Sequence, residues 1–152
     1  MYKLILVIAA IFIQSNEFTA QVTSVQDGDT VEIMWNDQKI LVRLYGVDCP
    51  EDGQGFSTKA KQYTDAVCRN KNVKVIKRTM DVHGRIIGDI ILPDGKDLAK
   101  ELLKFGYAWH YKEYSDDKDL AALEMEARRQ KKGLWVEANP MAPWEYKKTK
   151  KS

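Results

Sequence analysis

A chain of 152 residues is long enough for one domain with a buried core. Its composition, 44% apolar and 30% charged residues, excludes a disordered chain and a protein embedded in a membrane over its whole length. The formal net charge of +2 is too small to establish a polyanionic partner. Lysines crowd the C-terminus, but such a cluster alone is more often a solvated face.

The first twenty residues have the pattern of an export signal. A positive start at Lys3 precedes ten apolar residues that end at Ile13. Ten residues are too few to cross a bilayer, which takes about 20, and they fit the apolar region of a secretory signal peptide. We expect residues 1–20 to be a signal peptide cut after Ala20, and the mature protein to be secreted or periplasmic. The alternative is a buried N-terminal strand or helix, or an uncleaved anchor.

Alternating and β-branched runs predict an antiparallel meander after the leader. The alternation over 31–35 has the period of a half-buried strand, and further β-prone runs cover 21–25 and 40–47. The last of these runs contains Arg43. Because a guanidinium is costly to desolvate, Arg43 should have an anionic partner or face a polar cleft.

The rest of the chain is typical of three helices and two strands, in the order helix 57–69, strand 73–78, strand 86–92, helix 97–105 and helix 115–131. Pro140 and Pro143 mark an irregular tail. This order predicts an α+β domain, a five-stranded OB-type β-barrel with three α-helices. A flat sheet with helices on one side is the alternative. We expect one domain over 21–146, a basic tail over 147–152, and a monomer.

Carboxylates cluster at two predicted strand ends, in the segments 27–30 and 48–51. Functional groups collect on loops held by a rigid scaffold. Calcium takes about 6–8 oxygen ligands from carboxylates, backbone carbonyls and water. Asp29 and Asp48 with one carbonyl would leave positions for water and a substrate phosphate. Histidine and cysteine do not occur at zinc-like spacing, which disfavours zinc, whereas magnesium stays open.

These residues suit the cutting of a phosphodiester. Glu51 lies three residues past Asp48 and could order an attacking water and accept its proton. Arg43 and Arg85, the second in the turn-like segment 83–85, could hold phosphate oxygens and offset the charge that grows at phosphorus. Each motif alone is more often a structural turn or loop. Their occurrence together, in this order, favours an active site.

Taken together, the motifs resemble the staphylococcal-nuclease-like, or thermonuclease, family. The resemblance runs from about Val22 to Tyr146 and is carried by the segments Asp27-Gly28-Asp29-Thr30, Val42-Arg43-Leu44, Asp48-Cys49-Pro50-Glu51, His83-Gly84-Arg85, Lys132-Gly133-Leu134-Trp135 and Pro143-Trp144-Glu145. It implies a calcium-dependent endonuclease that cleaves DNA and RNA with little sequence specificity and leaves 3′-phosphates.

The resemblance also implies a role for each site residue. Its calcium ligands would be Asp29, Asp48 and the backbone carbonyl of Cys49, with Asp27 supporting the metal from outside the ligand set, and its catalytic residues would be Arg43, Glu51 and Arg85. The family often has threonine where this chain has cysteine, a change that a carbonyl contact tolerates. Some members carry a lysine-tyrosine pair before the glycine of the second arginine motif. This chain has Val82-His83 there.

Two other functions stay open at this point. A noncatalytic OB-fold module that binds single-stranded nucleic acid would need the barrel but not the calcium ligands. A calcium-stabilised structural domain would show a melting shift without cleavage. The sequence also leaves open whether Cys49 and Cys68 form a disulfide. Tyr111 and Tyr114 match the tyrosine-rich nucleotide pocket of the family only loosely.

Overall fold

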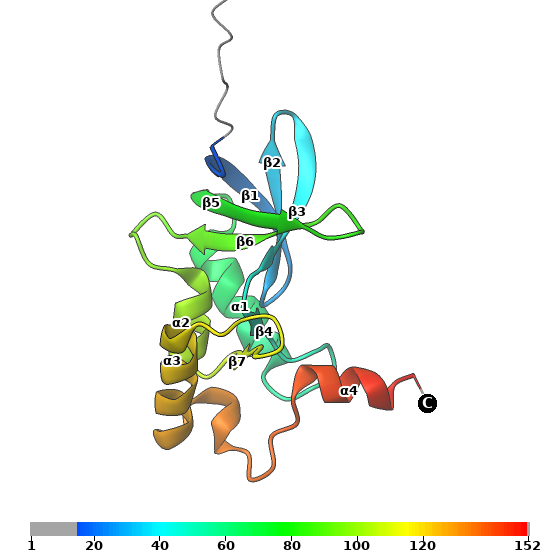
Figure 1. The fold of residues 1–152 in the computed structure, drawn as a ribbon, viewed down its shortest axis with the longest axis vertical. Helices are drawn as coiled ribbons and strands as arrows, with labels where there is room; N and C mark the ends of the chain where they lie inside the picture. Colours follow the sequence, from blue (N-terminus) through cyan, green and yellow to red (C-terminus); the bar gives the residue numbers. More distant parts are fainter. Residues whose placement is uncertain (1–14, 152) are drawn as a thin grey trace, which may run out of the picture.

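A closed five-stranded β-barrel is the centre of the computed structural model, which describes residues 15–151 (Figure 1). The strands follow the order β1-β2-β3-β6-β5 around the barrel. All neighbouring strands are antiparallel except β3 and β6, which run parallel. Their bounds are Glu17–Asp27 (β1), Thr30–Trp35 (β2), Gln38–Leu44 (β3), Asn72–Met80 (β5) and Ile86–Ile91 (β6). The predicted barrel is confirmed, and the flat sheet is wrong.

Alternating apolar side chains fill the barrel. The fully buried ones include Val22, Val31, Ile33, Val42, Val75 and Ile90. Because successive side chains of a strand point to opposite faces, Arg43 of β3 points away from the barrel interior. The strand period that places the core therefore also places this arginine on the outer surface.

The first strand begins before the expected cut after Ala20. Residues 17–21 pair with β5, and Phe18 stacks on Trp35 of β2 with ring centroids 4.4 Å apart. A cut after Ala20 would remove residues 17–20, which pair with β5. The leader boundary stays a prediction, and residues 1–14 of the expected leader lie outside the described residues.

The α-helices of residues 15–151 lie beneath the barrel in the view of Figure 1: α1 (Ser57–Cys68), α2 (Leu98–Lys104), α3 (Lys118–Arg129) and α4 (Pro143–Thr149). In α1 the buried residues recur every four positions, at Ala60, Thr64 and Cys68, and this face packs against β1. The third helix begins at Lys118 rather than at the predicted 115. The carboxylate of Asp117 caps it by accepting from the backbone N–H groups two and three residues on.

The C-terminal segment is helical where an irregular tail was predicted. The irregular tail expected after Pro140 instead contains α4, preceded by a 3₁₀ helix (η1, Gly133–Val136). Proline suits the first turn of a helix, where its missing N–H would be unpaired in any case, and Pro143 occupies the start of α4. The basic tail expected over 147–152 therefore begins inside a helix.

A second, two-stranded sheet connects the acidic loop to the aromatic segment. It pairs β4 (Val47–Asp48) with β7 (Trp109–His110) in antiparallel register. Cys49 follows β4 directly and is a buried free thiol, as is Cys68 on α1, so the two do not form a disulfide. Within residues 15–151, every helix is too short or too polar to cross a membrane.

Candidate active site

Arg43 joins the two acidic loops. Its Nη1 lies 3.2 Å from Asp29 Oδ2, and its Nη2 lies 2.8 Å from Asp48 Oδ1. Nη1 also donates to the backbone carbonyl oxygens of Leu44, at 3.2 Å, and Val47, at 2.8 Å. Arg43 therefore has the anionic partners that an arginine in an apolar strand requires. One side chain fixes the separation of the two aspartates.

Asp29 is buried and fully engaged. Its Oδ1 accepts from the Thr30 hydroxyl at 3.0 Å, and its Oδ2 accepts from the backbone N–H of Cys49 at 2.6 Å. Although burial opposes ionisation, Arg43 and these hydrogen bonds hold the pKa of Asp29 below its usual range. Asp29 thus keeps its negative charge and ties the β1–β2 turn to the loop after β4.

The carboxylates of Asp27 and Asp48 lie near that of Asp29. Asp27 Oδ1 accepts from the backbone N–H of Asp29 at 3.1 Å. Burial, and then the charge of Asp29, raise the pKa of Asp27 to about 7. Burial also raises the pKa of Asp48 to about 6, although Arg43 counteracts it. Two carboxylates contact one guanidinium and a third lies beside them, so the acidic groups outnumber the arginine.

The chemistry of these donors fits a hard cation. Carboxylate oxygens from Asp27, Asp29 and Asp48 are the ligands that calcium prefers. The described residues 15–151 contain no group of three or more His, Cys, Asp or Glu side chains that could hold a metal by themselves. A cation here would need water, a backbone carbonyl or substrate oxygens to complete its coordination. The ligand roles of Asp29, Asp48 and the Cys49 carbonyl, and the supporting role of Asp27, stay predictions.

Gly28 allows the loops to approach one another. A Cβ at this position would lie 2.7 Å from Cys49 Sγ and 2.8 Å from Ala60 Cβ, closer than such atoms pack. Thr64 of α1 donates its hydroxyl to the Gly28 carbonyl oxygen at 2.6 Å. The β1–β2 turn, the loop after β4 and α1 are therefore locked together, which holds the carboxylates in place relative to the helix.

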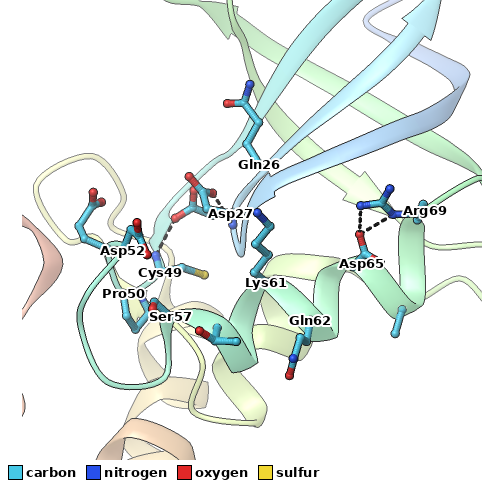
Figure 2. Close-up of a pocket in the computed structure, with 14 residues that line it drawn as sticks. Gln26, Asp27, Cys49, Pro50, Asp52, Ser57, Lys61, Gln62, Asp65 and Arg69 are labelled. Atoms are coloured by element: carbon cyan, nitrogen blue, oxygen red, sulfur yellow. Dashed lines mark hydrogen bonds and ion pairs between the residues drawn. The ribbon is translucent and has the colours of Figure 1, made fainter.

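A hollow of about 740 Å³ opens beside the carboxylates and runs along α1. Asp27 and Glu51 line it from the loops, and Lys61 lines it from the helix. Figure 2 shows Lys61 reaching from α1 toward the loop that carries Asp27, with the ion pair of Asp65 and Arg69 further along the helix. Lys61 makes no hydrogen bond or ion pair within the described part of the chain, so its charge is available to a ligand phosphate.

Glu51 is held from two sides at the edge of this hollow. Its backbone N–H donates to Gln54 Oε1 at 2.8 Å, and its Oε1 lies 3.0 Å from Lys147 Nζ of α4. The side chain is 34% exposed, so its carboxylate can reach water in the hollow.

Arg85 stands apart from the carboxylates. Its Nε lies 2.7 Å from Asp81 Oδ2, and its backbone N–H donates to Asp81 Oδ1 at 3.0 Å. The β3–β6 register pairs Arg43 with Ile87. Since side chains two residues apart share a face, Arg85 lies on the same outer face of the barrel as Arg43. Within residues 15–151 it makes no hydrogen bond or ion pair with the other proposed site residues.

Lys147 and Gln54 were not among the residues predicted for the site. Lys147 was expected in a basic tail, although the proline at the start of α4 is a local signal for a helix there. Tyr111, a loose match to a nucleotide pocket, stacks on Trp144 of α4 with ring centroids 5.0 Å apart. It also meets Tyr114 edge-on at 4.8 Å, so the two tyrosines pack on each other and on the C-terminal helix.

Comparison with known proteins identifies the family of this chain. A family model described as "Staphylococcal nuclease homologue" matches residues 41–137. An "Uncharacterized endonuclease" of Escherichia coli is 36% identical over 124 residues, which cover 82% of this chain and 81% of that protein. A "Micrococcal nuclease" of Shigella flexneri is 32% identical over 146 residues, covering 90% and 84%. "Staphylococcal-like nuclease CAN1" of Arabidopsis thaliana is 39% identical over 114 residues, covering 75% of this chain and 35% of that protein. The chain belongs to the staphylococcal nuclease family.

Proposed function

We propose that this protein is a calcium-dependent endonuclease that hydrolyses DNA and RNA with little sequence specificity and leaves 3′-phosphates. The observation that carries the proposal is the grouping of Asp29 and Asp48 on Arg43, with Asp29 and Glu51 lining one open hollow. Relatives named endonuclease and micrococcal nuclease, which align with 82% and 90% of the chain, support the reaction class.

The residues of the chain supply most of the chemistry. Glu51 accepts a proton from a water molecule in the hollow as that water attacks phosphorus. Arg43 and Arg85, on one face of the barrel, offset the negative charge that grows on the phosphoryl oxygens. The bond from phosphorus to the 5′ oxygen breaks and that oxygen takes a proton from solvent water to become a 5′ hydroxyl, which leaves the phosphate on the 3′ side. A calcium ion bound by Asp29 and Asp48 would add positive charge beside the same oxygens.

Low sequence specificity follows from the kind of groups that line the hollow. Charged and polar side chains such as Lys61 and Gln62 suit contacts to phosphate and sugar, which carry no sequence information. We also propose that the protein acts outside the cytoplasm as a monomer. The apolar leader supports export, and extracellular fluids supply calcium at levels that suit weak sites.

The proposal is tested with a labelled single-stranded oligonucleotide and three variants. Glu51→Gln and Arg85→Ala should each lower the cleavage rate at saturating calcium by about 100-fold or more. Arg129→Ala is the matched control, because Arg129 pairs with Glu126 on the exposed surface of α3, and it should keep the wild-type rate. All three should melt within about 2 °C of wild type, since none removes a buried group.

Two results would contradict the proposal. Wild-type turnover by Arg85→Ala or Glu51→Gln would remove that residue from the reaction. Binding of the oligonucleotide by the wild-type protein without any cleavage would instead favour the noncatalytic module.

A further inference from the structure

We propose that the C-terminal helix α4 belongs to the active site. Its Lys147 is a positioning residue that holds the Glu51 carboxylate at the edge of the hollow. The inference rests on the proposed function, because it assigns a support to the residue proposed to activate water. It concerns a lysine that the barrel motifs do not include.

An ion pair connects Lys147, near the C-terminus, to Glu51 in the loop after β4. Lys147 Nζ lies 3.0 Å from Glu51 Oε1, and the lysine side chain is half buried. Burial opposes the charge of Lys147, but Asp48, and then Glu51, attract it enough to raise its pKa. The ammonium group therefore contacts the Glu51 carboxylate and is also attracted by the charge of Asp48.

Aromatic packing fixes α4 against the sheet that carries Asp48. Trp144 stacks on Tyr111 with ring centroids 5.0 Å apart and 9° between the planes, and it meets Trp109 edge-on at 5.6 Å. Trp109 pairs with Asp48 in the β4–β7 register. Lys147 lies one turn along α4 from Trp144, so its backbone has a fixed position relative to the acidic loop.

The loop that carries Glu51 is braced from the same side. Gln54 accepts from the backbone N–H of Glu51 through Oε1, and it donates through Nε2 to the carbonyl oxygen of Met141 at 3.0 Å. At the other end of α4, Lys150 Nζ donates to the carbonyl oxygen of Asp52 at 3.0 Å. Both ends of the C-terminal segment therefore hold the loop.

The role of this arrangement is geometric. A solvent-exposed glutamate on a loop samples several rotamers, and ordering it costs conformational entropy. A partner held by a packed helix limits those rotamers before substrate arrives. Since a displacement of about 1 Å at a reacting group costs about 100-fold in rate, loss of Lys147 should lower turnover more than it lowers substrate affinity.

The experiment compares Lys147→Met, Lys147→Arg and Lys100→Met by steady-state kinetics on a labelled single-stranded oligonucleotide at saturating calcium. Methionine keeps the apolar stem and removes the charge. Lys147→Met should lower kcat by about 10- to 100-fold with KM within about 3-fold, and Lys147→Arg should recover most of the loss. Lys100 pairs with Asp119 between α2 and α3, so Lys100→Met should match wild type.

A double-mutant cycle shows whether Lys147 acts through Glu51. In a Glu51→Gln background, measured at high enzyme concentration, adding Lys147→Met should cause little further loss. Melting temperatures within about 2 °C of wild type would exclude misfolding, because Trp144 still anchors α4. Lys147→Gln is a second neutral variant for the same comparison.

The outcomes separate this inference from the proposed function. Unchanged or faster turnover by Lys147→Met would overturn it, as would a rise confined to KM or an equal loss in both backgrounds. If the wild-type protein does not cleave nucleic acid at all, the proposed function fails first.

Discussion

Replacing Arg43 by methionine should destabilise the protein strongly when calcium is absent. The side chain is 15% exposed and makes four polar contacts, two with carboxylates and two with backbone carbonyls. Removing one partner of a buried ion pair costs about 3–5 kcal/mol, because the other charges stay buried without compensation. Methionine fills much of the space of the arginine stem, so the loss is mainly electrostatic. We expect a loss of about 3–4 kcal/mol.

Urea unfolding followed by tryptophan fluorescence, with calcium chelated, measures this loss. For a protein of this size each kcal/mol lowers the melting temperature by about 2–4 °C, so the thermal shift should be about 6–16 °C. Arg78→Met is the matched control. Arg78 pairs with Asp89 at 2.9 Å on the outer barrel surface and is 47% exposed, so its loss should cost less than about 1 kcal/mol. Equal losses in the two variants would refute the idea that Arg43 holds the acidic loops together.

Three further predictions concern packing and the chain start. Gly28→Ala should cost about 1–3 kcal/mol and weaken calcium binding measured by calorimetry, because its Cβ would collide with Cys49 and α1; unchanged affinity would contradict the close packing. Burial raises the pKa of the Cys68 thiol to about 12, and that of Cys49 well above its usual range, so thiolates are absent at pH 8. Neither thiol should react with a disulfide reagent at pH 8 until urea unfolds the protein, and fast native reaction would show that the thiols are exposed. A chain that starts at Gln21 should have a free energy of unfolding about 2–3 kcal/mol lower than a chain that starts at Ser15, because β1 loses paired residues and a stacked ring. Equal midpoints in urea unfolding would support the cut after Ala20.

The barrel was predictable because its signal is local. The period-two alternation over 31–35 specifies which side chains enter the core, and the same alternation puts Arg43 outside. The need of that arginine for carboxylate partners follows from the cost of desolvating a guanidinium. The structure supplies those partners from the two acidic motifs, Asp29 and Asp48.

What the sequence did not predict depends on long-range packing. Lys147 and Glu51 are separated by most of the chain, and they meet because long-range contacts such as the stacking of Trp144 on Tyr111 dock α4 beside the acidic loop. The start of β1 was missed for a different reason. Its first residues follow an apolar run that has the pattern of an export signal, whereas their pairing with β5 and the stacking of Phe18 on Trp35 make them part of the barrel.

Cleavage of a labelled oligonucleotide through a cycle of calcium, excess chelator and restored calcium tests the central claim most directly. If the carboxylates on Arg43 form a calcium site beside Glu51, cleavage should stop on chelation, resume when calcium returns, and yield 3′-phosphate ends. A cleavage rate that does not change with chelator, or products with 5′-phosphate ends, would contradict this account of the site.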